Sequence, residues 1–167
     1  VLCGAQYDVS STGTLVYRRR LDDSSATVQW LDATAKQVPL LAKPGAYEGA
    51  PRVSPDGKRI AITIQDGCNQ NISVYEIERD QMNPLTSGEA VFANPIWMFN
   101  GRYVVYGTFT SGLRWSRPDG GQSPQVLQAG TSPQLPMAFS PDGRLWYVQA
   151  DGDPQIWSVP IEEDSGG

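Results

Sequence analysis

A tight-turn sequence occurs twice in the chain, as Ser54-Pro55-Asp56-Gly57 and as Ser140-Pro141-Asp142-Gly143. Proline fixes φ near the value that the first central position of a turn requires, aspartate can bond the backbone two residues further on, and glycine accepts a positive φ. Two degenerate copies, residues 10–13 and 98–101, also end in glycine, so turn glycines recur at positions 13, 57, 101 and 143. A period of about 40 residues predicts a repeat architecture.

The segments around each turn predict strands. An apolar inner run precedes the turn, and a run rich in β-branched and aromatic residues, which favour strands, follows it. The runs that follow the turns are residues 15–17, 60–64, 103–106 and 145–148. A third run is centred on an aromatic residue, at 28–31, 72–75, 113–115 and 155–159. A short fourth run includes proline in its first two copies, which indicates an outer, edge position, and it occurs at 38–41, 83–86 and 125–127.

Four strands in each unit of about 40 residues are typical of propeller blades. A helical solenoid of similar period would need apolar residues at three- and four-residue spacing, which these segments lack. The sequence therefore predicts an all-β fold, a β-propeller of four-stranded antiparallel blades in a single domain over residues 1–167. The expected blades are four, the last of them without its fourth strand, at residues 5–46, 47–90, 91–131 and 132–167.

One run of the chain, Pro136-Met137-Ala138-Phe139-Ser140-Pro141-Asp142-Gly143-Arg144, resembles the start of a blade in the TolB-like propeller repeats, which are related to WD repeats. Segments 13–17 and 51–61 look most like propellers attached to some bacterial serine/threonine kinases. The resemblance implies a bacterial repeat protein with an extracytoplasmic location and a ring of about six to eight blades. Blades one and three depart from the repeat, since Thr12 and Asn100 replace the turn aspartate.

The missing last strand leaves an unpaired sheet edge, and such edges invite association. Residues 1–3 can add that strand within the chain and close a small ring, although the connector to the first turn is short. Alternatively, two chains close one eight-bladed ring with residues 1–3 supplied by the partner, or the chain is a fragment of a longer protein. We expect the homodimer, because the resemblance implies a larger ring.

Composition excludes several kinds of chemistry. The chain has no histidine, so Ser-His-Asp and Cys-His nucleophile systems and histidine-based zinc sites are excluded within it. It also lacks a G-x-S-x-G elbow, a phosphate loop and a dinucleotide fingerprint. The two cysteines, Cys3 and Cys68, have no metal-binding spacing and are expected as isolated thiols. A net charge of −5 argues against nucleic acid as a partner, and no apolar stretch predicts membrane insertion.

Propellers commonly bind partners on the face that carries the connections from second to third and from fourth to first strands. These connections give an acidic rim with exposed aromatic residues, which are enriched in interface hot spots. The candidate rim residues are Asp22, Asp23, Tyr47, Glu48, Asp66, Asn69, Phe92, Asn94, Asp151 and Asp153. Asp8 and Arg52 occupy equivalent positions on adjacent inner strands, so we expect them to pair near the central channel. The acidic loops can be compared with Ca²⁺ sites, but we interpret them as solvated turns and predict neither a metal nor a cofactor.

The sequence therefore predicts a non-enzymatic propeller scaffold that binds a protein, peptide or small ligand at its acidic loop face or in its channel. Paired carboxylates can also catalyse glycoside chemistry, which leaves a carboxylate-dependent hydrolase or lyase with its site in the channel as an alternative. A second alternative is the sensor portion of a longer receptor or kinase.

Overall fold

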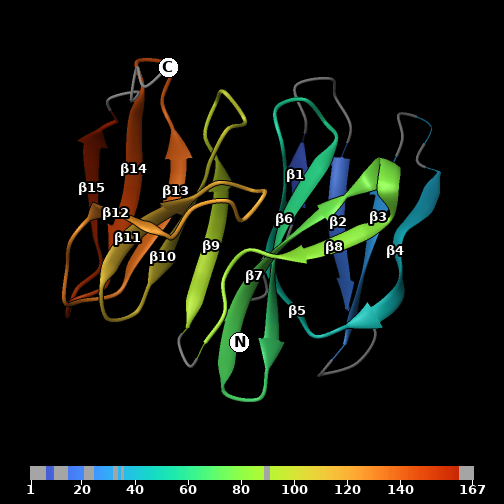
Figure 1. Ribbon diagram of the computed structural model, residues 1–167, viewed down its shortest axis with the longest axis horizontal. Helices are drawn as coiled ribbons and strands as arrows, with labels where there is room; N and C mark the ends of the chain where they lie inside the picture. The colour runs from blue at the N-terminus through green and yellow to red at the C-terminus, as the bar shows by residue number, and fades with distance from the viewer. Residues whose placement is uncertain are drawn as a thin grey trace.

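The computed structural model describes residues 7–9, 15–20, 25–31, 34, 36–88 and 91–161, with only the main chain described at 18–20 and 42. These residues form four antiparallel sheets that follow one another along the chain, and every sheet keeps its strands in sequence order (Figure 1). The first three sheets have four strands and the last has three. The predicted propeller of four-stranded antiparallel blades, with an incomplete last blade, is thereby confirmed.

The sheets are called blades 1 to 4. Blade 1 contains β1 (Tyr7–Val9), β2 (Leu15–Arg20), β3 (Ala26–Leu31) and β4 (Gln37–Gly45). Blade 2 contains β5 (Tyr47–Val53), β6 (Arg59–Asp66), β7 (Asn69–Glu76) and β8 (Gln81–Pro84), with the short 3₁₀ helix η1 (Ile77–Arg79) before β8. Blade 3 contains β9 (Phe92–Trp97), β10 (Val104–Thr108), β11 (Gly112–Ser116) and β12 (Gln125–Gln128). Blade 4 contains β13 (Gln134–Phe139), β14 (Arg144–Gln149) and β15 (Gln155–Pro160). In the described part of the chain, no helix has the length and apolarity to span a membrane.

The repeated turn joins the first and second strands of a blade, as the sequence predicts. Gly57 has φ +71° and its amide donates to the Ser54 carbonyl oxygen at 2.8 Å. The same bond closes the turns at Gly143 and at the degenerate copy ending in Gly101, which have φ +79° and +66°. In that degenerate copy, Asn100 replaces aspartate and still accepts a hydrogen bond from the Arg102 amide, at 2.9 Å. Side-chain oxygen and glycine therefore suffice for the turn. The first copy, residues 10–13, lies outside the described residues.

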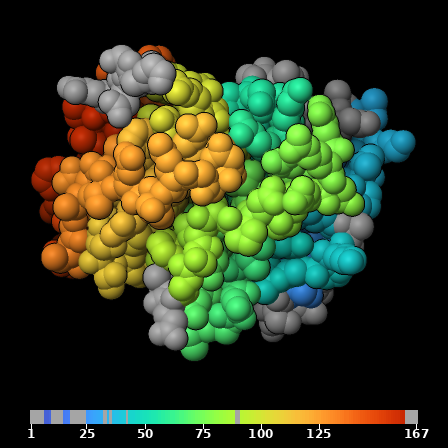
Figure 2. Space-filling model, in the orientation of Figure 1, coloured from blue at the N-terminus to red at the C-terminus, as the bar shows by residue number. Residues whose placement is uncertain are grey.

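Three apolar layers hold the blades together, one between each pair of neighbouring sheets. Strand alternation explains how one strand serves two layers: Ile60 and Ile62 of β6 face blade 1, whereas Ala61 between them faces blade 3. All three side chains are fully buried. Burying one large aliphatic side chain contributes about 1.5–3 kcal/mol. In the space-filling view, the green segments of blade 2 and the yellow and orange segments of blade 3 meet along the middle of the viewed face (Figure 2).

Polar contacts also fix the inner strands of blades 1 and 2. The Asp8 carboxylate accepts a hydrogen bond from the Val53 amide at 2.8 Å and lies 3.8 Å from Arg52 Nη1. The pairing of Asp8 with Arg52 that the sequence predicts is therefore present. Further along, Gly107 of β10 lies so close to β13 that a Cβ at this position would stand 1.9 Å from the Gln134 carbonyl oxygen. The approach of blade 4 to blade 3 thus requires glycine at position 107.

Candidate functional site

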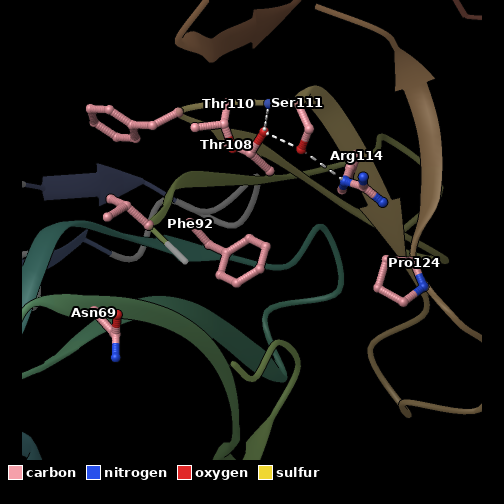
Figure 3. A pocket seen from close by; sticks show the side chains of 9 residues that line it. Asn69, Phe92, Thr108, Thr110, Ser111, Arg114 and Pro124 are labelled. Carbon is pink, nitrogen blue, oxygen red and sulfur yellow. Dashed lines mark hydrogen bonds between the residues drawn. The ribbon is translucent and has the colours of Figure 1, made fainter. Parts of the chain in front are cut away.

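A cavity of about 450 Å³ opens where blade 2 meets blade 3, and we call it the blade 2–3 pocket. It lies on the face that carries the β6–β7 and β10–β11 connections, which we call the loop face, opposite the Ser-Pro-Asp-Gly turns. Figure 3 shows Phe92 facing the row formed by Thr108, Ser111 and Arg114. The described residues that line it are Asn69, Val91, Phe92, Thr108, Phe109, Thr110, Ser111, Arg114 and Pro124.

The β10–β11 hairpin builds the polar side of the pocket. Thr108 ends β10, and its Oγ1 accepts a hydrogen bond from the Ser111 amide and donates one to the Gly112 carbonyl oxygen, both at 2.9 Å. Gly112 has φ +81°, and a Cβ there would stand 2.1 Å from the Gln128 carbonyl oxygen, so the hairpin requires glycine at this position. The Thr108 side chain and the neighbouring strand β12 therefore both fix the conformation of the hairpin.

Hydroxyl chemistry then sets the direction of the next hydrogen bond. A threonine hydroxyl has a single hydrogen, and that of Thr108 is used by Gly112. In the 2.9 Å contact between the two hydroxyls, Ser111 Oγ must therefore be the donor and Thr108 Oγ1 the acceptor. Ser111 Oγ in turn accepts a hydrogen bond from Arg114 Nε at 3.4 Å. The dashed lines in Figure 3 trace this relay from the hairpin to the guanidinium.

Arg114 is the one ionisable side chain among the described residues that line the pocket. Within the described part of the chain, it forms no ion pair with a carboxylate. The pocket therefore carries a positive charge that its own lining does not neutralise.

An aromatic contact fixes the apolar side of the pocket. The Phe92 ring meets the Tyr106 ring edge to face, with centroids 5.8 Å apart and planes at 81°. Tyr106 is fully buried, and its hydroxyl shares a 2.9 Å hydrogen bond with Ser116. Burial raises the Tyr106 pKa, although the Ser116 hydrogen bond and the nearby Arg114 charge oppose this. The phenol therefore stays neutral and Phe92 rests on a rigid support.

The structure distributes the rim residues that the sequence predicts over several places. Asn69 and Phe92 line the blade 2–3 pocket. Tyr47 lines a second cavity, and five others line none of the cavities described here: Glu48, Asp66, Asn94, Asp151 and Asp153. Asp66 pairs with Asn69 across the β6–β7 hairpin, and Asn94 lies in a bulge of β9 with φ +51°. Asp22 and Asp23 lie outside the described residues.

The two channel residues line a third cavity, of about 300 Å³. The inner strands of all four blades contribute to it, so it corresponds to the central channel. Its lining also includes Ser54, Pro55 and Phe99, which places its opening on the side of the repeated turns. The channel therefore opens at the end of the blades that carries the repeated turns, whereas the blade 2–3 pocket lies at the opposite end.

The second cavity, of about 430 Å³, lies between blade 1 and blade 2. In it, the Tyr75 hydroxyl donates a 2.7 Å hydrogen bond to Asp80. Burial, followed by this bond and the Asp80 charge, raises the pKa of Tyr75 to about 12. Burial also raises the pKa of Tyr47, whose ring covers the Cα of Gly45, where a Cβ would stand 2.7 Å from the ring.

Thr108, Ser111 and Arg114 are not among the site residues that the sequence predicts. One signal for Arg114 was available, because it stands between Leu113 and Trp115 in a predicted strand and alternation gives it the opposite face. The hydroxyl relay leaves no comparable signal, because it depends on the conformation of the hairpin.

In comparisons of sequence, no protein-family model and no curated protein matches the chain. Solved structures do match. A structure from Agrobacterium tumefaciens described as a TolB superposes with a TM-score of 0.79 and 16% identity, over 93% of this chain and 61% of that one. TolB from Acinetobacter baumannii superposes with a TM-score of 0.75 and 16% identity, over 94% of this chain and 40% of that one.

The chain has the TolB-like propeller fold. This TolB-like propeller spans about 61% and 40% of the length of the two TolB structures. A gluconolactonase from Xanthomonas campestris also superposes, with a TM-score of 0.70 and 13% identity, over 93% of this chain and 56% of that one. At these identities the likeness concerns the fold, which therefore accommodates enzymes as well as TolB proteins. The finer resemblance to propellers attached to kinases stays a prediction.

Proposed function

We propose that this TolB-like propeller is a non-enzymatic scaffold that binds a small ligand or a peptide in the blade 2–3 pocket. One observation carries the proposal. A cavity of about 450 Å³ combines aromatic and apolar walls with a small number of convergent polar groups, which is the usual composition of a ligand site. Its polar groups are held in place by the relay from Gly112 to Arg114, so the site is formed before a ligand arrives.

The chemistry of the lining supports binding rather than turnover. A serine nucleophile needs a base that takes its proton, and the chain contains no histidine for that role. The hydrogen of Ser111 Oγ is directed at Thr108 instead. Among the described residues, no carboxylate lines the pocket, so this part of the lining does not supply a pair of acids for glycoside chemistry either.

The test is a shift-mapping experiment with ¹⁵N-labelled protein. The probes are a panel of aromatic carboxylates, aromatic amides, amines and neutral sugars, each at millimolar concentration. We expect at least one class to shift the signals of Asn69 and of the hairpin amides from Thr108 to Ser111. The variant Thr110→Trp places an indole at an exposed position of the lining and should abolish these shifts.

The matched control is Gln81→Trp, which adds the same indole at an exposed position of β8, at the end of blade 2 that faces away from the pocket. It should bind as the unmodified protein does. Equal shifts in Thr110→Trp, or shifts confined to other residues for every class in the panel, would contradict the proposal.

We also propose that two chains associate through their terminal blades. Leu145 and Tyr147 of β14 pack on blade 3, so alternation turns Trp146 to the opposite face, together with Ile156 of β15. Trp146 is 42% exposed and Ile156 is 73% exposed. On blade 1, Tyr7 and Val9 of β1 are exposed as well. A second copy would cover both faces and continue the blade sequence. An extracytoplasmic location remains part of the proposal and rests on the resemblance to TolB-like propellers.

A further inference from the structure

We propose that the blade 2–3 pocket recognises a carboxylate on its ligand, and that Arg114 is the residue that binds it. This inference rests on the proposed function, because it names the chemistry of the ligand for the same pocket. It is carried by the position of Arg114, which forms no ion pair with a described residue, in a cavity whose other described walls are aromatic, aliphatic or neutral and polar.

No described residue forms a hydrogen bond with the two Nη atoms of Arg114, which leaves them for a ligand. The guanidinium has five N–H groups in a planar fork, and the single hydrogen bond that it makes to a described residue uses Nε. The two Nη atoms remain, and their parallel N–H groups match the two oxygens of a carboxylate. A lone arginine with this geometry is therefore suited to a planar anion.

The relay from Gly112 through Thr108 and Ser111 restricts the orientation of this arginine. Ser111 Oγ accepts from Nε, while its own hydrogen is donated to Thr108, which holds the hydroxyl in place as an acceptor for the guanidinium. Arginine side chains have many rotamers, and a residue that is already held loses less freedom when it binds. Ser111 therefore acts as a positioning residue for Arg114.

The charge of the site indicates a monoanion. The described residues of the lining supply one positive charge, whereas the whole chain has a net charge of −5. A phosphate near neutral pH carries up to two negative charges, and it would meet one cation within an acidic protein. A carboxylate carries one charge and matches the site.

The remaining walls indicate what carries the carboxylate. Phe92 is held edge to face by Tyr106, and Pro124 stands at the Arg114 end of the pocket (Figure 3). A flat apolar group can stack between such walls while the carboxylate reaches Arg114. A free aromatic acid and the C-terminus of a peptide that ends in phenylalanine share this chemistry.

The experiment compares two carboxylates with their amides by isothermal titration. The probes are 3-phenylpropionate with 3-phenylpropionamide, and N-acetyl-glycyl-phenylalanine with its C-terminal amide. We expect at least one carboxylate to bind about tenfold or more tightly than its amide, since hydrogen bonds to charged groups are the stronger ones. Binding of the free acid alone would identify a small acid, whereas binding of the dipeptide alone would identify a peptide terminus.

Variants assign the effect to its residue. Arg114→Gln should reduce the affinity of the carboxylate to that of its amide, and Ser111→Ala should weaken it several-fold while the preference for carboxylate persists. Arg117→Gln removes the same charge from an exposed ion pair with Asp119 outside the pocket, and it should bind normally. Well-dispersed ¹H–¹⁵N spectra of each variant establish that it is folded.

These measurements distinguish a pocket that binds no ligand from a pocket that binds ligands without preferring carboxylates. If amides and carboxylates bind equally and Thr110→Trp abolishes both, the pocket binds ligands and the carboxylate assignment is wrong. If Arg114→Gln binds the carboxylates as tightly as Arg117→Gln does, or if neither carboxylate binds at millimolar concentration, the assignment is likewise overturned.

Discussion

The indole Nε1 of Trp97 donates a hydrogen bond of 2.8 Å to the main-chain carbonyl oxygen of Arg52, one blade earlier in the chain. The Arg59 guanidinium lies 4.9 Å from the centre of the same indole and donates to the Gly101 carbonyl oxygen at 3.1 Å. Trp97 ends β9 and Phe92 begins it, so the position of Trp97 against blade 2 also sets the position of Phe92 in the blade 2–3 pocket.

Replacing this donor should destabilise the protein. Trp97→Phe keeps an aromatic ring but removes the N–H group, which leaves the Arg52 carbonyl without this partner. We expect a loss of about 1–3 kcal/mol in the free energy of unfolding, measured by urea denaturation. Trp157→Phe is the control, because Trp157 is 48% exposed on β15 and should change stability by less than about 0.5 kcal/mol. Equal losses in the two variants would contradict the role given to the Trp97 hydrogen bond.

Because blades 3 and 4 lie in close contact, replacing Gly107 by alanine should cost more stability than replacing Gly120. Gly107→Ala would place a methyl group 1.9 Å from the Gln134 carbonyl oxygen, and neither the Cβ nor this backbone oxygen can move without shifting a strand. Overpacking of this kind should cost about 3 kcal/mol or more. Gly120→Ala meets no atom within 4 Å and is strained by its φ of +69°, so it should cost about 1–2 kcal/mol. Similar thermal midpoints for both variants would show that the blades are not in such close approach.

The tyrosine of the second cavity predicts a loss of stability in alkali. The folded pKa of Tyr75, about 12, lies above its ordinary value of 10.0, chiefly because of burial and then because of Asp80. A raised folded pKa favours the protonated phenol in the native state, so its contribution to stability is complete below pH 10 and is lost as pH rises toward 12. Near-ultraviolet absorbance should show the Tyr75 phenol ionising late, together with Tyr47 and the buried Tyr106, whose pKa values are also raised.

The same titration in two variants separates the causes. Asp80→Asn should lower the pKa of Tyr75 while leaving it above the ordinary value, because the ring remains buried. Glu78→Gln removes an equivalent charge from the exposed surface of η1 and should leave the titration unchanged. A Tyr75 that ionises normally in the unmodified protein would contradict the described burial.

The proposed association of two chains predicts a concentration-dependent mass. Sedimentation equilibrium should give a dimer for the unmodified chain, and Ile156→Glu should shift it toward monomer, because the charge enters the apolar face of blade 4. Val126→Glu introduces the same charge at an exposed position of β12, outside the terminal blades, and should leave the mass unchanged. A monomer at all concentrations would contradict this proposal.

The fold was predictable because its determinants are local. Gly57, Gly101 and Gly143 repeat at fixed spacing, and each turn needs only a polar side chain and a positive φ. The pairing of Asp8 with Arg52 was predictable for the same reason, since equivalent positions on adjacent inner strands must meet. The pocket was less accessible, because Thr108 and Arg114 gain their roles where two blades meet. The predicted acidic rim was only partly useful for finding this pocket. The sequence places all its residues in connections between strands, but Asn69 and Phe92 line one pocket whereas Asp151 and Asp153 lie elsewhere.

The most direct test of a ligand site between blades 2 and 3 is a crystal structure of the protein with the tightest-binding compound from the panel. We expect density for the compound between Phe92 and Ser111, within the lining of the blade 2–3 pocket. Density for the compound in the channel or on the face that carries the Ser-Pro-Asp-Gly turns, with only solvent in the blade 2–3 pocket, would contradict the proposed site.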